Sequence, residues 1–250
     1  MKSIRVKNGS REFLEIKKMN TFQNTYDNSA AQAPASERAA FIRKTYLHLA
    51  GAILAFGVLE YFLISSGIGV VIAQSMLSVS WLLVLGAFMG VSFLANWWAN
   101  SSASRPMQYL GLALYIAAQA VIFLPLLFIA SYSAGGGVIL EAGIYTVALF
   151  AALTTVVFIT RKDFSFLAPI LTIGGFLALG FIAVSLLFGF SLGSLFALIM
   201  VAFASAAILY DTSNVLHHYR TDQHVAASLS LFASVALLFW YILRIFSSRD

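Results

Sequence analysis

The sequence has 250 residues, of which 60% are hydrophobic and 10% charged, and it contains no cysteine. A soluble domain carries about 25% charged residues, and a single core cannot bury this much apolar surface in water. The formal net charge is +5, but nine of the fifteen Lys and Arg residues precede position 45. This composition excludes an ordinary soluble domain and thiolate chemistry, and the clustered charge is not that of a nucleic-acid-binding surface.

Residues 1–44 are polar and of mixed charge, and they include a small-residue stretch at 29–36. Such a segment cannot bury enough apolar surface to offset the entropy lost on ordering. We therefore predict a flexible cytoplasmic tail at 1–44 and a membrane domain at 45–250. Met19 provides a second plausible start, and we hypothesise that residues 1–18 are an over-extended start.

Seven apolar stretches follow, each close to the roughly 20 residues with which a helix crosses about 30 Å of hydrocarbon. We predict membrane-spanning helices at 45–65, 79–99, 107–130, 138–159, 164–188, 192–216 and 225–246. Residues 66–78 are weakly apolar, and they either form an interfacial segment or extend the second helix. The predicted fold is an all-α, multi-pass bundle of seven transmembrane helices in a lipid bilayer.

Positive charge alternates between the short loops. The loops after the second, fourth and sixth helices contain four basic residues, namely Arg105, Arg161, Lys162 and Arg220. The loops after the first, third and fifth helices contain none. Because Lys and Arg accumulate in cytoplasmic loops, we predict that the N-terminus lies inside and the C-terminus outside.

Two pairs of glycines have the four-residue spacing that lets membrane helices approach closely. These pairs are Gly86 with Gly90, and Gly189 with Gly193. We interpret both pairs as helix-packing positions.

Three carboxylates fall inside the predicted spans, where an ionisable group costs at least about 2.5–3.5 kcal/mol. Glu60 and Glu141 lie near outer helix ends, where they can reach the headgroups or pair with Arg244. Asp211 is deeper, since it precedes Arg220 by nine residues, or about 14 Å of helix rise. Asp211 is therefore the leading candidate for a functional group.

Polar residues continue from Asp211 along one helix face. Asn214 and His218 follow it at helical spacing and form a stripe that leads towards the cytoplasm. If the sixth and seventh helices turn around Asp222, Asp211 lies level with Ser234. Such a carboxylate is either a proton- or cation-responsive site or a hydrogen-bonded structural aspartate, and the residues leave both interpretations open.

The sequence offers no catalytic constellation. It lacks the GxSxG, HExxH and P-loop motifs, and we expect no Ser–His–Asp set at one depth. His217, His218 and His224 are interpreted as a solvated, positively charged loop, because adjacent helical side chains point about 100° apart and could hardly share a metal. We predict that the chain is not an enzyme, with no firm metal site and no cofactor beyond a sensed or transported Ca²⁺ or H⁺.

Three segments resemble the Bax inhibitor-1/YccA family of membrane proteins, and the likeness covers about residues 40–250. They are LYDTS at 209–213, TYLHL at 45–49, and LRIF at 243–246 with the ending SRD at 248–250. Tyr210, Asp211 and Thr212 form the most specific motif. The resemblance implies a seven-helix bundle in which six helices wrap the final one.

The resemblance also implies functions. Some members are described as pH-sensitive calcium leak channels in which two aspartates share a proton, others as regulators of a membrane-anchored AAA protease, and eukaryotic members as suppressors of cell death. Asp211 matches the first aspartate, whereas Ser234 occupies the second position. The chain thus lacks the aspartate pair and is closer to the YccA-like branch. It also has no arginine within 81–98 to latch Asp211.

Two functions from different classes follow. The first is a pH-sensitive cation leak channel or stress regulator centred on Asp211. The second is an interaction protein that binds and modulates a membrane-anchored AAA protease, with the polar tail as a contact segment. A transporter ranks lower, because paired helix breaks and inverted repeats are not evident. The YccA-like features favour the bacterial inner membrane.

Overall fold

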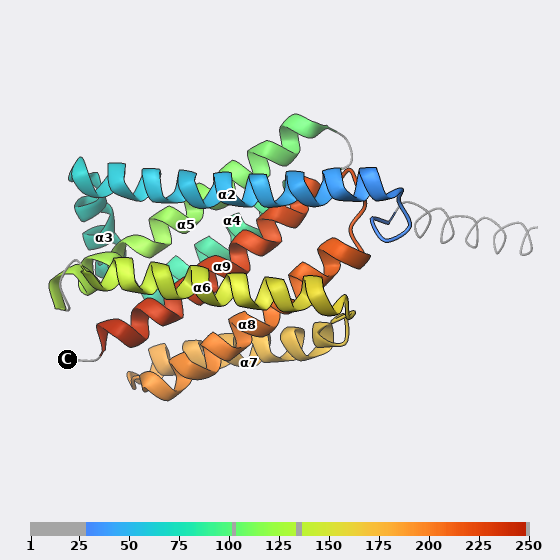
Figure 1. Cartoon of the computed structure of the whole chain (residues 1–250). Helices are drawn as coiled ribbons and strands as arrows, with labels where there is room; N and C mark the ends of the chain where they lie inside the picture. Colours follow the sequence, from blue (N-terminus) through green and yellow to red (C-terminus); the bar gives the residue numbers. More distant parts are fainter. Residues whose placement is uncertain (1–28, 102–103, 134–136, 249–250) are drawn as a thin grey trace, which may run out of the picture.

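The computed structural model describes residues 29–101, 104–133 and 137–248, which form eight α-helices and no β-strand. The helices are α2 (Ala35–Ser65), α3 (Ile68–Ser78), α4 (Trp81–Ala99), α5 (Arg105–Ser133), α6 (Gly137–Thr160), α7 (Leu167–Phe188), α8 (Gly193–His217) and α9 (His224–Ser247) (Figure 1). All except α3 are long and apolar enough to cross a membrane. Each predicted span overlaps one of them, which confirms the seven-helix prediction. The hypothesised over-extended start at 1–18 lies outside the described residues.

The first helix begins earlier than the apolar pattern predicts. α2 starts at Ala35, so Arg38, Arg43 and Lys44 lie on the helix and not in the tail. Hydropathy marks only the part of a helix that lies in lipid, whereas Ala, Glu, Arg and Lys favour helix in water as well. The predicted boundary at 44/45 therefore marks where α2 becomes apolar.

Residues 68–78 form the separate short helix α3, so they do not extend the second membrane helix, and an interfacial position stays a prediction. Gly67 separates α3 from α2 with a φ of 76°, a left-handed conformation that glycine adopts without strain. α3 folds back and packs chiefly on α5 and α2.

The last helix, α9, forms the centre of the bundle (Figure 1). Of its membrane-crossing window 72% is buried, compared with 11% for α4 and for α7. α9 packs against α2, α4, α5, α6 and α8, and small residues such as Ala226, Ala227 and Ser228 let these neighbours approach closely. The expected wrapping by six helices is thus met by five, because α7 packs mainly on α8.

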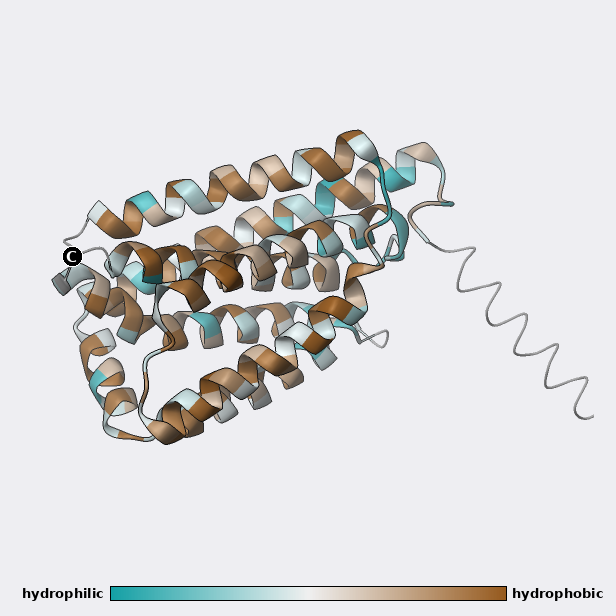
Figure 2. Cartoon of the chain, turned by 90° about the horizontal axis from the view of Figure 1, so that it is seen from below, coloured by the Kyte–Doolittle hydropathy of each residue, from teal (hydrophilic) through white to brown (hydrophobic). Residues whose placement is uncertain are grey.

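The outer surface of the bundle is apolar. Phe93, Ile159 and Phe176 are among many large hydrophobic side chains that are more than 70% exposed. Figure 2 shows hydrophobic residues along the helices, with hydrophilic residues more frequent at the end where α2 begins. A soluble monomer rarely exposes apolar patches of this extent, so these side chains face lipid.

The closest helix approach involves a glycine outside the predicted pairs. A Cβ atom added to Gly111 of α5 would lie 2.5 Å from the carbonyl oxygen of Ala95 and from the amide nitrogen of Ala99, both in α4. Only glycine permits this contact between the two backbones.

The packing role predicted for the two glycine pairs is wrong. Gly86 and Gly90 have no atom within 4 Å of an added Cβ. Gly189 and Gly193 have positive φ angles and form the turn between α7 and α8. Spacing alone does not identify which glycines face a neighbouring helix.

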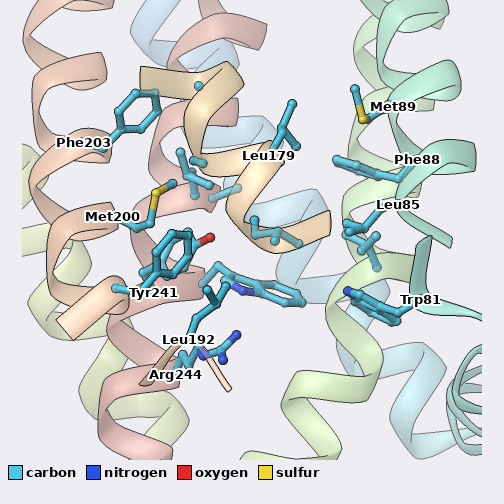
Figure 3. A pocket seen from close by; sticks show the side chains of 18 of the residues that line it. Trp81, Leu85, Phe88, Met89, Leu179, Leu192, Met200, Phe203, Tyr241 and Arg244 are labelled. Carbon is cyan, nitrogen blue, oxygen red and sulfur yellow. The ribbon is translucent and has the colours of Figure 1, made fainter. Parts of the chain in front are cut away.

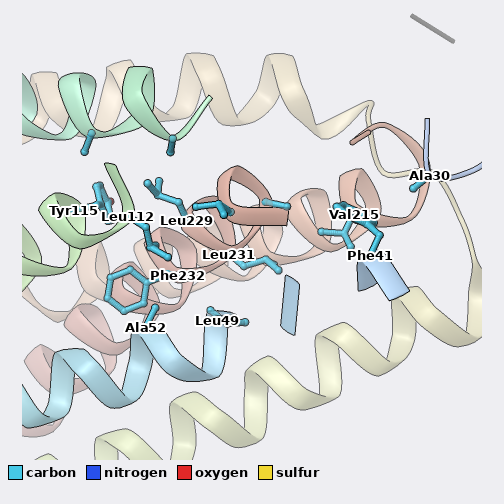
Figure 4. Close-up of a cluster of buried hydrophobic side chains, with 14 residues drawn as sticks. Ala30, Phe41, Leu49, Ala52, Leu112, Tyr115, Val215, Leu229, Leu231 and Phe232 are labelled. Carbon is cyan, nitrogen blue, oxygen red and sulfur yellow. The ribbon is translucent and has the colours of Figure 1, made fainter. Parts of the chain in front are cut away.

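Residues just before α2 contact the loop between α8 and α9. The amide of Ala30 donates a hydrogen bond to the carbonyl oxygen of Tyr219 over 2.8 Å, and Ser29 pairs with Arg220 in an isolated β-bridge. Ala30 is fully buried in a cluster of hydrophobic side chains that includes Phe41 of α2 and Val215 of α8 (Figure 4). This end of the predicted tail is therefore attached to the α8–α9 hairpin.

Candidate functional site

The α8–α9 hairpin brings Asp211 and Ser234 together. The Ser234 hydroxyl donates a hydrogen bond to Oδ2 of Asp211 over 2.6 Å, at the level that the hairpin geometry predicts. Ser234 is buried, and Asp211 is partly buried. The contact confirms the predicted register of the two helices, while the role of the pair stays a prediction.

Several buried hydroxyl groups lie on helices around this pair. Thr212, the residue after Asp211, is fully buried, and Tyr46 of α2 lies close to it and to Thr154 of α6. The two threonine hydroxyls both approach the Tyr46 hydroxyl. These three oxygen groups come from three helices, and Tyr46 is near enough to Asp211 to be affected by its charge.

Two cavities approach Asp211 from opposite ends of α9. A large cavity of about 690 Å³ lies among α4, α5, α7, α8 and α9, and its lining includes Ala207 and Ser234 (Figure 3). A small cavity of about 370 Å³ lies near the loops and is lined by Tyr210, Asn214 and His218, with Ser165, Ala168, Tyr219 and Gln223. Ser234 lines the large cavity, and Asp211 follows directly after Tyr210, which lines the small one.

The predicted polar stripe is divided by this arrangement. Asn214 and His218 line the small cavity, whereas Asp211 bonds to Ser234 on α9. Tyr210 also lines the small cavity, and Thr212 faces the opposite side of α8. The family motif therefore presents its three side chains to three different environments.

A partner of His218 escaped the sequence analysis. Its Nε2 atom lies 3.1 Å from Oδ2 of Asp163 in the α6–α7 loop. Burial raises the pKa of Asp163, but hydrogen bonds from Ser165 and His218 outweigh it and lower the pKa below its usual value. No local sequence signal links Asp163 to His218, because 54 residues separate them.

Ser213 attaches the same loop to α8. Its hydroxyl oxygen accepts a hydrogen bond from the amide of Phe164 over 2.9 Å and lies 3.4 Å from both Asp163 Oδ1 and His217 Nδ1. Ser213, both histidines and Asp163 thus lie close together, a grouping that the spacing of these residues did not indicate. The histidine beside Ser213 is His217, whereas Asp163 contacts His218, so no single histidine links the serine to the carboxylate.

Glu60, Glu141 and Arg244 do not form the alternative ion pair. Glu60 is 6% exposed, and neither of its carboxylate oxygens has a hydrogen-bond partner among the described residues. Glu141 is exposed on α6, and Arg244 lines the large cavity. The three residues lie on α2, α6 and α9, and those helices direct them to different surroundings.

The three histidines do not share one solvated loop. His224 is buried, and its ring lies 4.9 Å from that of His48 on α2 in an edge-to-face arrangement. His218 is exposed and His217 half-buried. Across the described residues, no group of three His, Cys, Asp or Glu side chains could hold a metal ion.

Comparison with known proteins gives consistent matches. A family model described as "Inhibitor of apoptosis-promoting Bax1" matches residues 38–250. Bax inhibitor 1 of Schizosaccharomyces pombe is 30% identical over 237 residues, which cover 90% of this chain and 81% of that protein. An uncharacterized protein of Pseudomonas aeruginosa is 41% identical over 113 residues, 45% of this chain and 50% of that one.

One bacterial relative has a functional name. "Modulator of FtsH protease YccA" of Escherichia coli is 34% identical over 122 residues, which cover 47% of this chain and 55% of that protein. The chain spans about half the length of several curated relatives that it matches, including two from Arabidopsis thaliana.

Proposed function

Because the chain belongs to the Bax inhibitor-1 family of membrane proteins, we propose that it mediates a pH-sensitive cation leak controlled at Asp211. The supporting observation is the Asp211–Ser234 hydrogen bond, in which Ser234 lines the large cavity and Asp211 adjoins Tyr210 of the small cavity. In the proposed path an ion passes from one cavity to the other beside this hydrogen bond. Calcium is the proposed cargo.

The surrounding groups suit a cation better than an anion. An ionised Asp211 supplies negative charge, and the hydroxyls of Tyr46, Thr154 and Thr212 supply neutral oxygen ligands, the type that hard cations prefer. A proton on Asp211 removes the charge that attracts the cation. The leak should therefore decrease as the pH falls.

The test is calcium flux into liposomes that contain the purified protein, between roughly pH 6 and 8, a range that brackets neutral pH. Asp211→Asn keeps the side-chain shape but cannot ionise, so we expect it to abolish the pH dependence. Asp222→Asn is the matched control, because Asp222 pairs with Arg220 in the exposed loop. Silent wild-type liposomes, or an unchanged profile in Asp211→Asn, would refute the leak.

The second candidate is modulation of a membrane-anchored AAA protease, and the name of the Escherichia coli relative favours it. Ser29 and Ala30 attach the N-terminal segment to the α8–α9 loop, so a partner that binds this segment would contact the hairpin that carries Asp211. Deletion of residues 1–28 leaves this attachment intact. It should weaken recovery of the protease in a pull-down, and equal recovery would argue against binding through the tail.

We further propose that the protein lies in a bacterial inner membrane with its N-terminus in the cytoplasm. The alternating loop charges support this orientation. The small cavity and the Asp163 contacts would then lie on the cytoplasmic side, and Arg244 on the opposite side.

A further inference from the structure

The large cavity is apolar along almost its whole length. Its walls consist mainly of aromatic and aliphatic side chains, which include Trp81, Phe88, Leu179, Met200, Phe203 and Tyr241 (Figure 3). Its volume of about 690 Å³ falls in the range of roughly 300–1,000 Å³ that small-molecule sites occupy. An apolar lining of this kind suits a ligand with a hydrocarbon chain.

The cavity is as deep as one membrane leaflet. Its lining on α9 extends from Ala233 to Arg244, eleven residues apart, which corresponds to about 16 Å of helix rise. The lining on α8, from Phe196 to Ala207, has the same length. Half of a hydrocarbon core of about 30 Å is about 15 Å. The cavity therefore matches a lipid acyl chain in depth.

The cavity opens on the lipid-facing surface. Met89, Leu186 and Phe190 line it, and they are nevertheless 49%, 38% and 47% exposed. α4 and α7, which form opposite walls, contact each other only sparsely. An acyl chain can enter from the bilayer between these two helices.

One cation stands at the end of the cavity. Arg244 is half-buried one turn before the end of α9, and Figure 3 shows it with Leu192 at the same end as Trp81. Its guanidinium forms no ion pair or hydrogen bond with any described residue. A half-desolvated guanidinium favours an anionic partner, and its planar fork fits phosphate oxygens.

We propose that the large cavity binds an anionic phospholipid from the surrounding leaflet, with one acyl chain between α4 and α7 and the phosphate on Arg244. The depth, the apolar lining, the lateral opening and the position of the cation all fit this occupant. Binding does not depend on the proposed leak. If the proposed cation leak is also correct, the end of the acyl chain reaches Ser234 and fills the part of the cavity nearest Asp211. The bound lipid would then restrict ion passage.

Two tryptophans report on the cavity directly. Trp81 and Trp240 line it, whereas Trp97 and Trp98 lie at the other end of α4 and are replaced by phenylalanine in the test protein. The protein is placed in unlabelled phosphatidylcholine vesicles that contain a small fraction of lipid brominated on its acyl chain. Quenching by brominated phosphatidylglycerol is then compared with quenching by brominated phosphatidylcholine.

Both lipids carry a phosphate, but the choline cation of phosphatidylcholine neutralises it and repels Arg244, so we expect phosphatidylglycerol to bind roughly tenfold more tightly. Arg244→Gln should reduce the preference below about twofold, whereas Arg244→Lys should retain most of it, because a point charge still attracts phosphate. Lys162→Gln, an exposed cation at the other end of the bundle, is the matched control and should behave as wild type.

Three results would overturn the proposal. Equal quenching by the two brominated lipids in the unaltered cavity would mean that the cavity does not select an anionic headgroup. An undiminished preference in Arg244→Gln would remove the phosphate site. Displacement of brominated phosphatidylglycerol by a free fatty acid at a lower mole fraction would assign the cavity to fatty acids. None of these readouts involves ion flux, so failure here is distinguishable from failure of the leak.

Discussion

At the scale of single residues, Ser234 is the one direct hydrogen-bond partner of Asp211 among the described residues. Ser234→Ala leaves this carboxylate in the bundle without its donor, so we expect a loss of about 1–3 kcal/mol in unfolding free energy. Thermal or denaturant unfolding in detergent measures it. Ser205→Ala on α8 is the control, because that hydroxyl only donates to the carbonyl oxygen of Val201 in its own helix. Equal effects of both changes would contradict a special role for Ser234.

Glu60 presents the opposite case, a buried carboxyl group without a partner. Glu60→Met replaces it with an apolar side chain of similar volume, and we expect stability to rise by about 1 kcal/mol or more, as in other buried ionisable sites. Glu141→Met, on the exposed face of α6, should leave stability nearly unchanged. A clear loss of stability in Glu60→Met would show that the carboxyl group binds something.

The sequence predicted some residue contacts and missed others for a physical reason. Asp211 and Ser234 are linked by a short loop, so counting equal numbers of residues from the turn placed them level. Asp163 and His218 meet through tertiary packing of a loop against a helix end, which no spacing rule describes. The burial of His224 against His48 is of the same type.

At the scale of helices, the contact of α4 and α5 at Gly111 leads to a sharp prediction. In Gly111→Ala the new Cβ atom would lie 2.5 Å from backbone atoms of Ala95 and Ala99, which cannot rotate away. We expect a loss of roughly 1–3 kcal/mol, the usual range for overpacking. Gly143→Ala in α6 meets no atom within 4 Å and should be neutral or stabilising. Similar melting temperatures for the two variants would contradict the contact.

The attachment of the α6–α7 loop to α8 should depend on pH. The lowered folded-state pKa of Asp163 means that its contribution is fully present above the unfolded value of about 3.9 and is lost as pH falls through the folded value. The pair is solvent-exposed, so we expect at most about 0.5 kcal/mol. Asp163→Asn should therefore be slightly less stable than wild type at pH 7, and the difference should shrink as the pH falls below the unfolded value. A stability difference between wild type and Asp163→Asn that grows on acidification would contradict the predicted pH dependence.

Hydropathy predicted the helices well but not their interfaces. The apolar runs indicate which residues can lie in lipid, and seven spans follow directly from their lengths. In a bundle that is apolar on all sides, however, hydropathy does not distinguish the lipid face of a helix from its packed face. The spacing of the glycine pairs therefore predicted helix contacts that do not exist. The close contact is formed by Gly111, which lies next to the small residues of α4.

At the scale of the whole molecule, the central position of α9 and the large cavity are linked. α7 packs on α8, so the side of α9 that it leaves uncovered becomes a wall of the cavity. The family resemblance indicated a central final helix, yet the cavity could not be predicted, because it depends on how far apart α4 and α7 lie. Arg244, interpreted first as a partner for Glu60 or Glu141, acquires its proposed role only through that cavity.

The proposed orientation can be tested because the chain contains no cysteine of its own. Lys162→Cys marks the loop before α7 and Ser191→Cys the turn after it, and both positions are exposed. With the N-terminus in the cytoplasm, a membrane-impermeant maleimide should label Ser191→Cys in intact spheroplasts and Lys162→Cys only after lysis. The reverse pattern would invert the orientation and move Arg244 to the cytoplasmic leaflet. Labelling of both from outside would mean that α7 does not cross the membrane, and the wall of the lipid cavity would then be missing.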